Sequence, residues 1–113
     1  MDFTTARQFV VNQMLPTAEK SDTFLQQLQQ REAPIPGQVT SLLLALKALF
    51  EGLRSAQQLD RELAYALFRL AHESRRAFEA GKRAGVEWPP LLDEDLSRIA
   101  IAVTSIFADE WQG

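Results

Sequence analysis

The sequence predicts an all-α protein, a single-domain bundle of about four to five helices that spans residues 1–113. Apolar residues recur at spacings of three and four along most of the chain, which is the period of an amphipathic helix and not of a strand. Prolines and glycines fall mainly between these stretches, where helices are expected to end. A chain of 113 residues with 46% hydrophobic residues is long enough to close one core without disulfides.

Two short helices are expected in residues 1–33. Asp2 is placed to cap the first, whose apolar stripe runs to Met14 and which Pro16 should stop, because the residue before a proline avoids helical torsions. The second is expected from about residue 21 to residue 31, with leucine and phenylalanine on one side and glutamine on the other. A helix this short depends on tertiary packing.

Three long helices are expected in residues 36–111, over 36–54, 56–82 and 93–111. Pro36 suits the first turn of one of them, and Ser55 with Gln58 matches a capping box for the next. The turn between these two would be only a few residues, so we expect them to be antiparallel neighbours.

Glycines and charges mark the ends of the last two helices. Gly81 and Gly85 are plausible stops for the helix over 56–82, and basic residues near them suit the negative end of the helix dipole. Asp93 begins an acidic run that suits the start of the last helix, whose apolar stripe continues to Trp111.

Composition argues against several classes of function. A net charge of −3 and a pI of about 5.1 disfavour binding to nucleic acid and to an anionic membrane surface. The longest apolar stretch, Leu42 to Phe50, is interrupted by Lys47 and is far short of the roughly 20 residues that cross a bilayer. The absence of cysteine and of a secretory signal pattern leads us to expect a cytoplasmic protein.

The chain lacks a phosphate-binding loop. Gly81-Lys82 is its only Gly-Lys pair, but Arg76 stands where the loop needs its first glycine and Arg83 where it needs a hydroxyl. A dinucleotide fingerprint and a serine-hydrolase elbow are missing as well. We therefore expect no catalytic and no cofactor-binding residues.

A metal site is not expected either. His72 is the only histidine, and the second histidine of a helical zinc motif would have to be Arg76. The run Asp93-Glu94-Asp95 lacks the spacing and the glycine of a calcium loop, so we interpret it as charge at a helix start.

Two surfaces carry more apolar or small side chains than one core contact requires. One is a row of small residues that would let another helix approach closely, and the other is a second face of the helix over 56–82 with tyrosine and arginine, which are enriched at interfaces. Alternatively, the N-terminal segment or the last helix covers both, and Trp88 and Trp111 plug the ends of the bundle. The candidate interface residues are Ser41, Ala45, Ala48, Gly52, Tyr65, Phe68, Arg69, His72 and Arg76.

Two runs resemble a family of short cyanobacterial all-helical proteins of undetermined function, some of which are labelled dethiobiotin synthetase. The runs are Pro36-Gly37-Gln38-Val39-Thr40-Ser41-Leu42-Leu43-Leu44-Ala45-Leu46-Lys47 and Glu87-Trp88-Pro89-Pro90-Leu91-Leu92-Asp93-Glu94-Asp95-Leu96. The resemblance implies no functional residues. A dethiobiotin synthetase binds ATP through a phosphate-binding loop on an α/β fold, and this chain has no such loop.

The sequence thus favours a non-enzymatic protein that acts by association with another protein, either a second copy as a homodimer or a different subunit. The alternative is a small-molecule binder or enzyme, including one of the dethiobiotin synthetase type, with a pocket between helices. Because no polar side chains converge in the sequence to orient a ligand, this alternative ranks second.

Overall fold

A computed structural model describes residues 1–15 and 23–113, and its helices confirm the all-α fold class, with no strand in these ranges. The α-helices are α1 (Phe3–Met14), α2 (Phe24–Gln29), α3 (Gln38–Gly52), α4 (Arg61–Phe68), α5 (Ser74–Arg83) and α6 (Leu92–Ala108). A π-helical segment, η1 (Arg69–Glu73), joins α4 to α5, so that residues 61–83 form one long helix.

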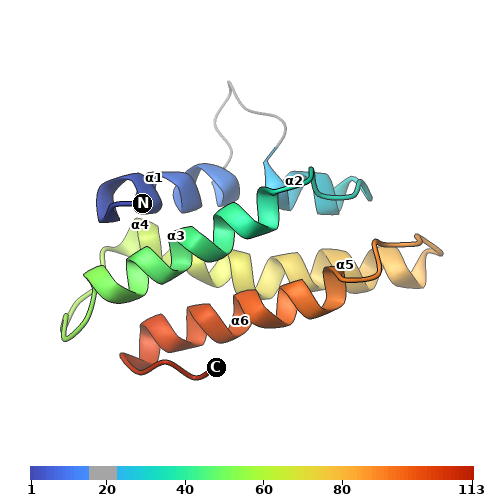
Figure 1. Cartoon of the computed structure of the whole chain (residues 1–113). Coiled ribbons are helices and arrows are strands. Elements are labelled where there is room, and N and C mark those ends of the chain that lie inside the picture. The colour runs from blue at the N-terminus through green and yellow to red at the C-terminus, as the bar shows by residue number, and fades with distance from the viewer. Residues whose placement is uncertain (16–22) are drawn as a thin grey trace.

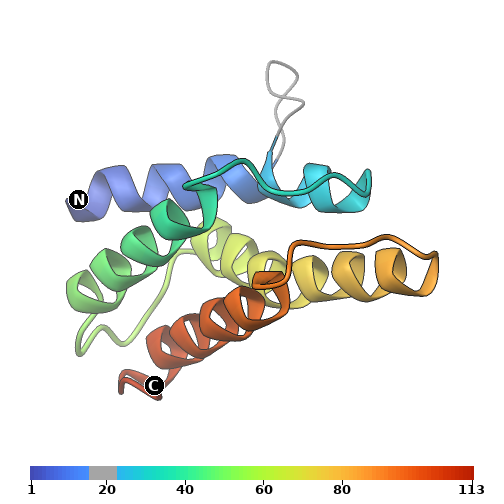
Figure 2. The ribbon, with the colours of Figure 1, turned by 45° about the vertical axis from the view of Figure 1, so that its right-hand side comes forward.

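The long helix organises the bundle. The helices α1 and α2 follow one another along one side of it, α1 against α4 and α2 against α5 (Figures 1 and 2). The helices α3 and α6 lie side by side, and α6 crosses the long helix at η1. The expectation that α3 and α4 are antiparallel neighbours is wrong, because α3 packs against α1 and α6.

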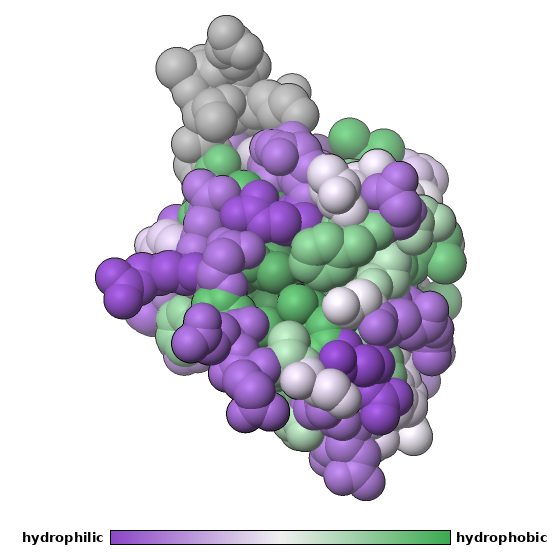
Figure 3. All heavy atoms as spheres, turned by 90° about the vertical axis from the view of Figure 1, so that its left-hand side faces the viewer, coloured by the Kyte–Doolittle hydropathy of each residue, from purple (hydrophilic) through white to green (hydrophobic). Residues whose placement is uncertain are grey.

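The core confirms most of the predicted apolar pattern, but the stripe predicted to reach Trp111 stops short of it, because Phe107 and Trp111 are exposed. It draws fully buried leucines from α3 and from the long helix, and apolar side chains from α1, α2 and α6. Figure 3 views the end of the bundle that carries the N-terminus, where hydrophobic atoms occupy the middle and hydrophilic side chains surround them. The largest fully buried side chains include Val10, Met14, Phe24, Leu28, Leu42, Leu46, Leu49, Leu63, Leu67, Leu70 and Ile99.

The predicted start of the long helix at Ser55 is wrong. Ser55 has a positive φ of 65°, and the helix begins at Arg61 with Asp60 as its N-cap, whose Oδ1 accepts a hydrogen bond from the Leu63 N–H at 2.8 Å. Arg7 on α1 fixes Asp60, because its Nε lies 2.9 Å from Oδ2. These hydrogen bonds, that of Arg7 first, hold the pKa of the Asp60 carboxyl below its ordinary value.

The helices α1, α2 and α3 each begin directly after their N-cap residue. Asp2 caps α1 as predicted, through a 2.7 Å hydrogen bond from the Thr5 N–H. Pro16 and the residues predicted to begin the second helix lie outside the described ranges, and α2 begins after Thr23, which forms a capping box with Gln26. The helix α3 begins after Gly37, whose φ of 86° only glycine adopts without strain, and not at Pro36.

Gly85, one of the two predicted stops, ends the long helix, whereas α6 ends before the predicted Trp111. Gly81 lies inside α5, and the helix stops at Gly85, where φ is 91° and the Val86 N–H donates to the Gly81 carbonyl oxygen at 2.9 Å. The helix α6 ends at Ala108, after which Asp109 adopts a φ of 56° and the chain turns back. No helix in the described ranges has the length and apolar character to cross a membrane.

Candidate functional site

The row of small residues on α3 is covered only in part by the domain itself. Ala45 is fully buried, and the Phe3 ring of α1 lies so close to Gly52 that an added Cβ would meet its Cδ2 at 2.5 Å. Ser41 and Ala48 are partly buried, and Gly52 is exposed. The row thus lets α1 approach α3 closely, which is the alternative in which the N-terminal segment covers it.

The second predicted surface remains open. We call Tyr65, Phe68, Arg69, His72 and Arg76 the aromatic–arginine face. Tyr65 is 53% exposed and Phe68 is 52% exposed, although both belong to residue types that are usually covered. The structure therefore brings the five predicted residues together along one solvent-facing side of the long helix.

Each of the two aromatic rings contacts a side chain four residues further along the chain. The guanidinium carbon of Arg69 lies 5.7 Å from the centre of the Tyr65 ring, and its Nη1 donates a long hydrogen bond of 3.5 Å to the Tyr65 hydroxyl. The imidazole of His72 stacks on Phe68 with 5.0 Å between ring centres and 24° between planes. Each exposed ring therefore has a neighbouring side chain within the domain that limits its motion.

The π-helical segment lies in the middle of this face. Its closing hydrogen bond runs from the Ser74 N–H to the Arg69 carbonyl oxygen, five residues back. The Nε of Arg69 is buried and has no hydrogen-bond partner in the described residues. Segments of this kind are frequent at functional sites, which sequence periodicity does not show.

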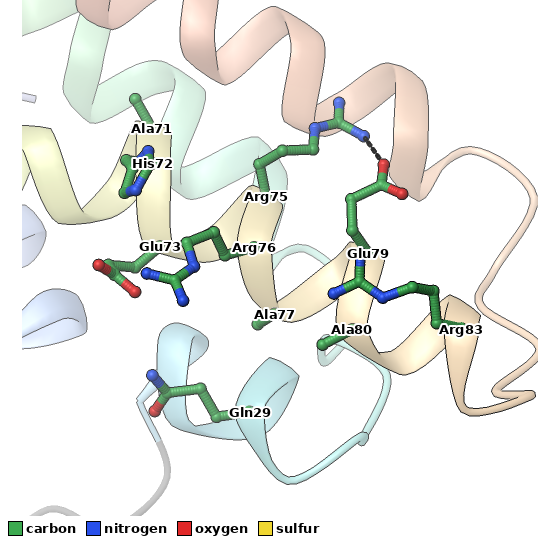
Figure 4. Close-up of a pocket in the computed structure, with 10 residues that line it drawn as sticks. All are labelled: Gln29, Ala71, His72, Glu73, Arg75, Arg76, Ala77, Glu79, Ala80 and Arg83. Atoms are coloured by element: carbon green, nitrogen blue, oxygen red, sulfur yellow. Dashed lines mark ion pairs between the residues drawn. The ribbon is translucent and has the colours of Figure 1, made fainter.

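A groove of about 620 Å³ continues from the face, between α5 and α2. Ala77 and Ala80 of α5 and Gln29 of α2 are among the ten residues that line it (Figure 4). In the close-up the guanidinium groups of Arg76 and Arg83 lie over this groove, whereas Arg75 points away toward α6. The groove is thus lined both by small side chains and by the side chains of two arginines.

The charges of the groove are unevenly paired. Arg75 lies 2.6 Å from the Asp93 carboxylate and 3.6 Å from that of Glu79. Arg76 and Arg83 form no ion pair with any residue in the described ranges, and Glu73 is the remaining carboxylate. Among the described residues, the groove therefore presents two guanidinium groups without an ion pair, together with the Glu73 carboxylate and the Glu79 carboxylate that pairs with Arg75.

The two tryptophans pack on the domain itself. The Trp88 indole N–H donates to the Phe78 carbonyl oxygen at 3.0 Å, and its ring lies over Gly81. Trp111 packs edge-on against Phe50, with 5.2 Å between ring centres, below the ammonium group of Lys47. These contacts match the plug interpretation for Trp88, which is partly buried, whereas Trp111 remains 41% exposed.

An apolar hollow lies between residues 34–40 and 89–95, lined mainly by prolines, Ile35 and Leu91. Its volume of about 210 Å³ is below the roughly 300 to 1,000 Å³ of small-molecule pockets. Within the described part of the chain, no three histidine, aspartate or glutamate side chains are grouped so that they could hold a metal ion.

Comparisons with protein-family models, with curated proteins and with solved structures give no match. The resemblance to the cyanobacterial family therefore stays a prediction.

Sequence reasoning identified the aromatic–arginine face but missed the groove. The sequence favours charge at a helix end for Arg83, with binding of an acidic partner or a phosphate as the alternative, and its spacing of seven residues from Arg76 places both on one side of a helix. Gln29 belongs to a different helix, so no local pattern connects it to Arg76. Its place in the groove follows from the packing of α2 on α5.

Proposed function

We propose that this protein acts by binding another protein through the aromatic–arginine face. The observation that carries the proposal is the pair of aromatic rings, Tyr65 and Phe68, that are each more than half exposed and are each held by a neighbouring side chain. Aromatic residues and arginine dominate the energetics of protein interfaces. Since a neighbouring side chain already limits the motion of each ring, binding would cost them little conformational entropy.

The charge of the surface favours a different protein over a second copy. Arg69, Arg76 and Arg83 lie along this side of the long helix, and none forms an ion pair with a described residue. A two-fold homodimer would place this patch against itself. The like charges would then face one another, which costs several kcal/mol. We therefore propose an acidic partner protein rather than a homodimer.

The test is capture of the partner from native extract, followed by measurement with the purified partner. Four immobilised proteins are compared: wild type, Tyr65→Glu, Phe68→Glu and the control Leu44→Glu, whose side chain is 59% exposed on α3. Because all three positions are exposed, circular dichroism and Tm should match wild type for each variant. We expect about tenfold or greater loss of affinity for the two face variants and none for the control.

Equal binding by all four proteins would contradict the proposal, as would the lack of any captured protein. Light scattering over a dilution series gives the remaining outcome. A dimer that Phe68→Glu dissociates would assign the face to self-association and overturn the proposal of an acidic partner.

A further inference from the structure

We infer that a helix of the partner binds in the groove between α2 and α5. Two carboxylates of that helix, seven residues apart, bind Arg76 and Arg83. This inference rests on the proposed function and specifies the chemistry of the partner. It starts from the two guanidinium groups over the groove, which have no ion pair with any described residue.

The spacing of the exposed side chains fits a helix. Arg76 and Arg83 both lie in α5, and a spacing of seven residues keeps them on one side of an α-helix. Arg83 lies about two turns, or roughly 10.5 Å, from Arg76. A second helix along this side repeats the same period, so that its own carboxylates seven residues apart face both arginines.

The groove is shaped for close approach of a backbone. Ala77 and Ala80 line it from α5, and small side chains at a helix contact reduce the distance between helix axes. Gln29 on the opposite side offers an amide that donates to and accepts from a polar side chain of the partner. The aromatic rings at the other end of the face supply apolar contact.

The charges favour carboxylates as the groups that bind. Guanidinium groups bind carboxylates through two parallel hydrogen bonds. Glu73, three residues before Arg76, lines the same groove, so its charge weakens the attraction of a carboxylate to Arg76 more than to Arg83. Arg75 is not available, because Asp93 and Glu79 already pair with it.

The experiment selects peptides that bind to the whole protein. The probe is a displayed library of amphipathic 22-residue helices with a fixed apolar stripe and random polar positions. Peptides are selected on wild type and depleted on the double variant Arg76→Glu/Arg83→Glu. We expect the retained peptides to carry Asp or Glu pairs seven residues apart.

Affinities of a retained peptide are then measured for single variants. Arg76→Glu and Arg83→Glu should each weaken binding by roughly tenfold. The control Lys82→Glu makes the same charge change beside Arg83 but outside the groove, and its affinity should stay within about twofold of wild type. Changing the matching peptide glutamate to lysine should restore binding to the Arg76→Glu variant.

Three results would overturn the inference: no enrichment, acidic pairs at spacings other than seven, or an equal effect of Lys82→Glu. The failure of this inference is separable from that of the proposed function. If Tyr65→Glu abolishes binding of the native partner while the library yields no acidic helix, the association stands and the acidic helix does not.

Discussion

The substitution Gly81→Ala should destabilise this protein, although replacing glycine by alanine ordinarily stabilises a helix. It lies inside α5, and the indole of Trp88 rests on it, so that a Cβ there would meet Cζ2 at 2.5 Å and both Cε2 and Nε1 at 3.0 Å. The indole is fixed by its hydrogen bond to the Phe78 carbonyl oxygen and by stacking on the Phe78 ring at 6.0 Å. Gly81→Ala must therefore displace Trp88.

The magnitude follows from two opposing effects. Replacing glycine by alanine in a helix interior stabilises a protein by about 0.5 to 1 kcal/mol. Displacing the indole loses a hydrogen bond worth about 1 kcal/mol and overpacks the site at a cost of about 1 to 3 kcal/mol. We expect the free energy of unfolding of Gly81→Ala to fall by about 1 to 3 kcal/mol.

Urea denaturation of four proteins measures this as a double-mutant cycle: wild type, Gly81→Ala, Trp88→Ala and the double variant. In the Trp88→Ala background the indole is gone, so Gly81→Ala should stabilise by about 0.5 to 1 kcal/mol. The sign of the substitution thus reverses between the two backgrounds. Stabilisation by Gly81→Ala in the wild-type background would refute the packing of Trp88 on Gly81.

Two further predictions concern buried hydroxyls and pH. Ser74 is fully buried with no hydrogen-bond partner for Oγ in the described residues, whereas the equally buried Ser105 donates to the Ile101 carbonyl oxygen and accepts from the Gln112 N–H, each at 2.8 Å. Urea denaturation should show Ser74→Ala neutral or stabilising by up to about 1 kcal/mol and Ser105→Ala destabilising by about 1 to 2 kcal/mol, and the opposite order would contradict this assignment. Because the folded pKa of Asp60 is lowered by Arg7 and by the Leu63 N–H, its stabilising contribution is complete above its unfolded pKa of about 4 and is lost as pH falls through the folded pKa. Asp60→Asn should therefore lose less stability than wild type on acidification below about pH 4, and identical pH profiles from thermal unfolding would argue against the pairing with Arg7.

Elements set by local periodicity were predictable from the sequence. Leu63, Leu67 and Leu70 follow one another at the four- and three-residue spacing of one side of a helix, and all three are buried. Asp2 was identified as a cap because the hydrogen bond that it accepts comes from a residue only three positions away. In such cases the residues that determine the structure lie within a few positions of one another.

Elements set by distant residues were not predictable. Ser55 and Gln58 match a capping box, but the long helix starts after Asp60, which Arg7 contacts from 53 residues away. Gly81 fits a helix stop in the local pattern, yet Trp88 packs over it within the helix. Local propensity is a weak prior that tertiary contacts override.

The small-residue row of α3 and the aromatic–arginine face differ in how far neighbouring helices cover them, and the packing of the helices explains both cases. The helix α3 has α1 on one side and α6 on another, so its small-residue row is covered in part: Ala45 is buried and the Phe3 ring lies against Gly52. The long helix has α1 and α2 along one side and α6 across η1, which leaves the side of Tyr65 and Phe68 without a neighbouring helix in the described part of the chain. An aromatic pair in contact with Arg69 and His72 adds exposed apolar area that the domain itself does not use. For this reason the argument for association depends on the long helix and not on the row of α3.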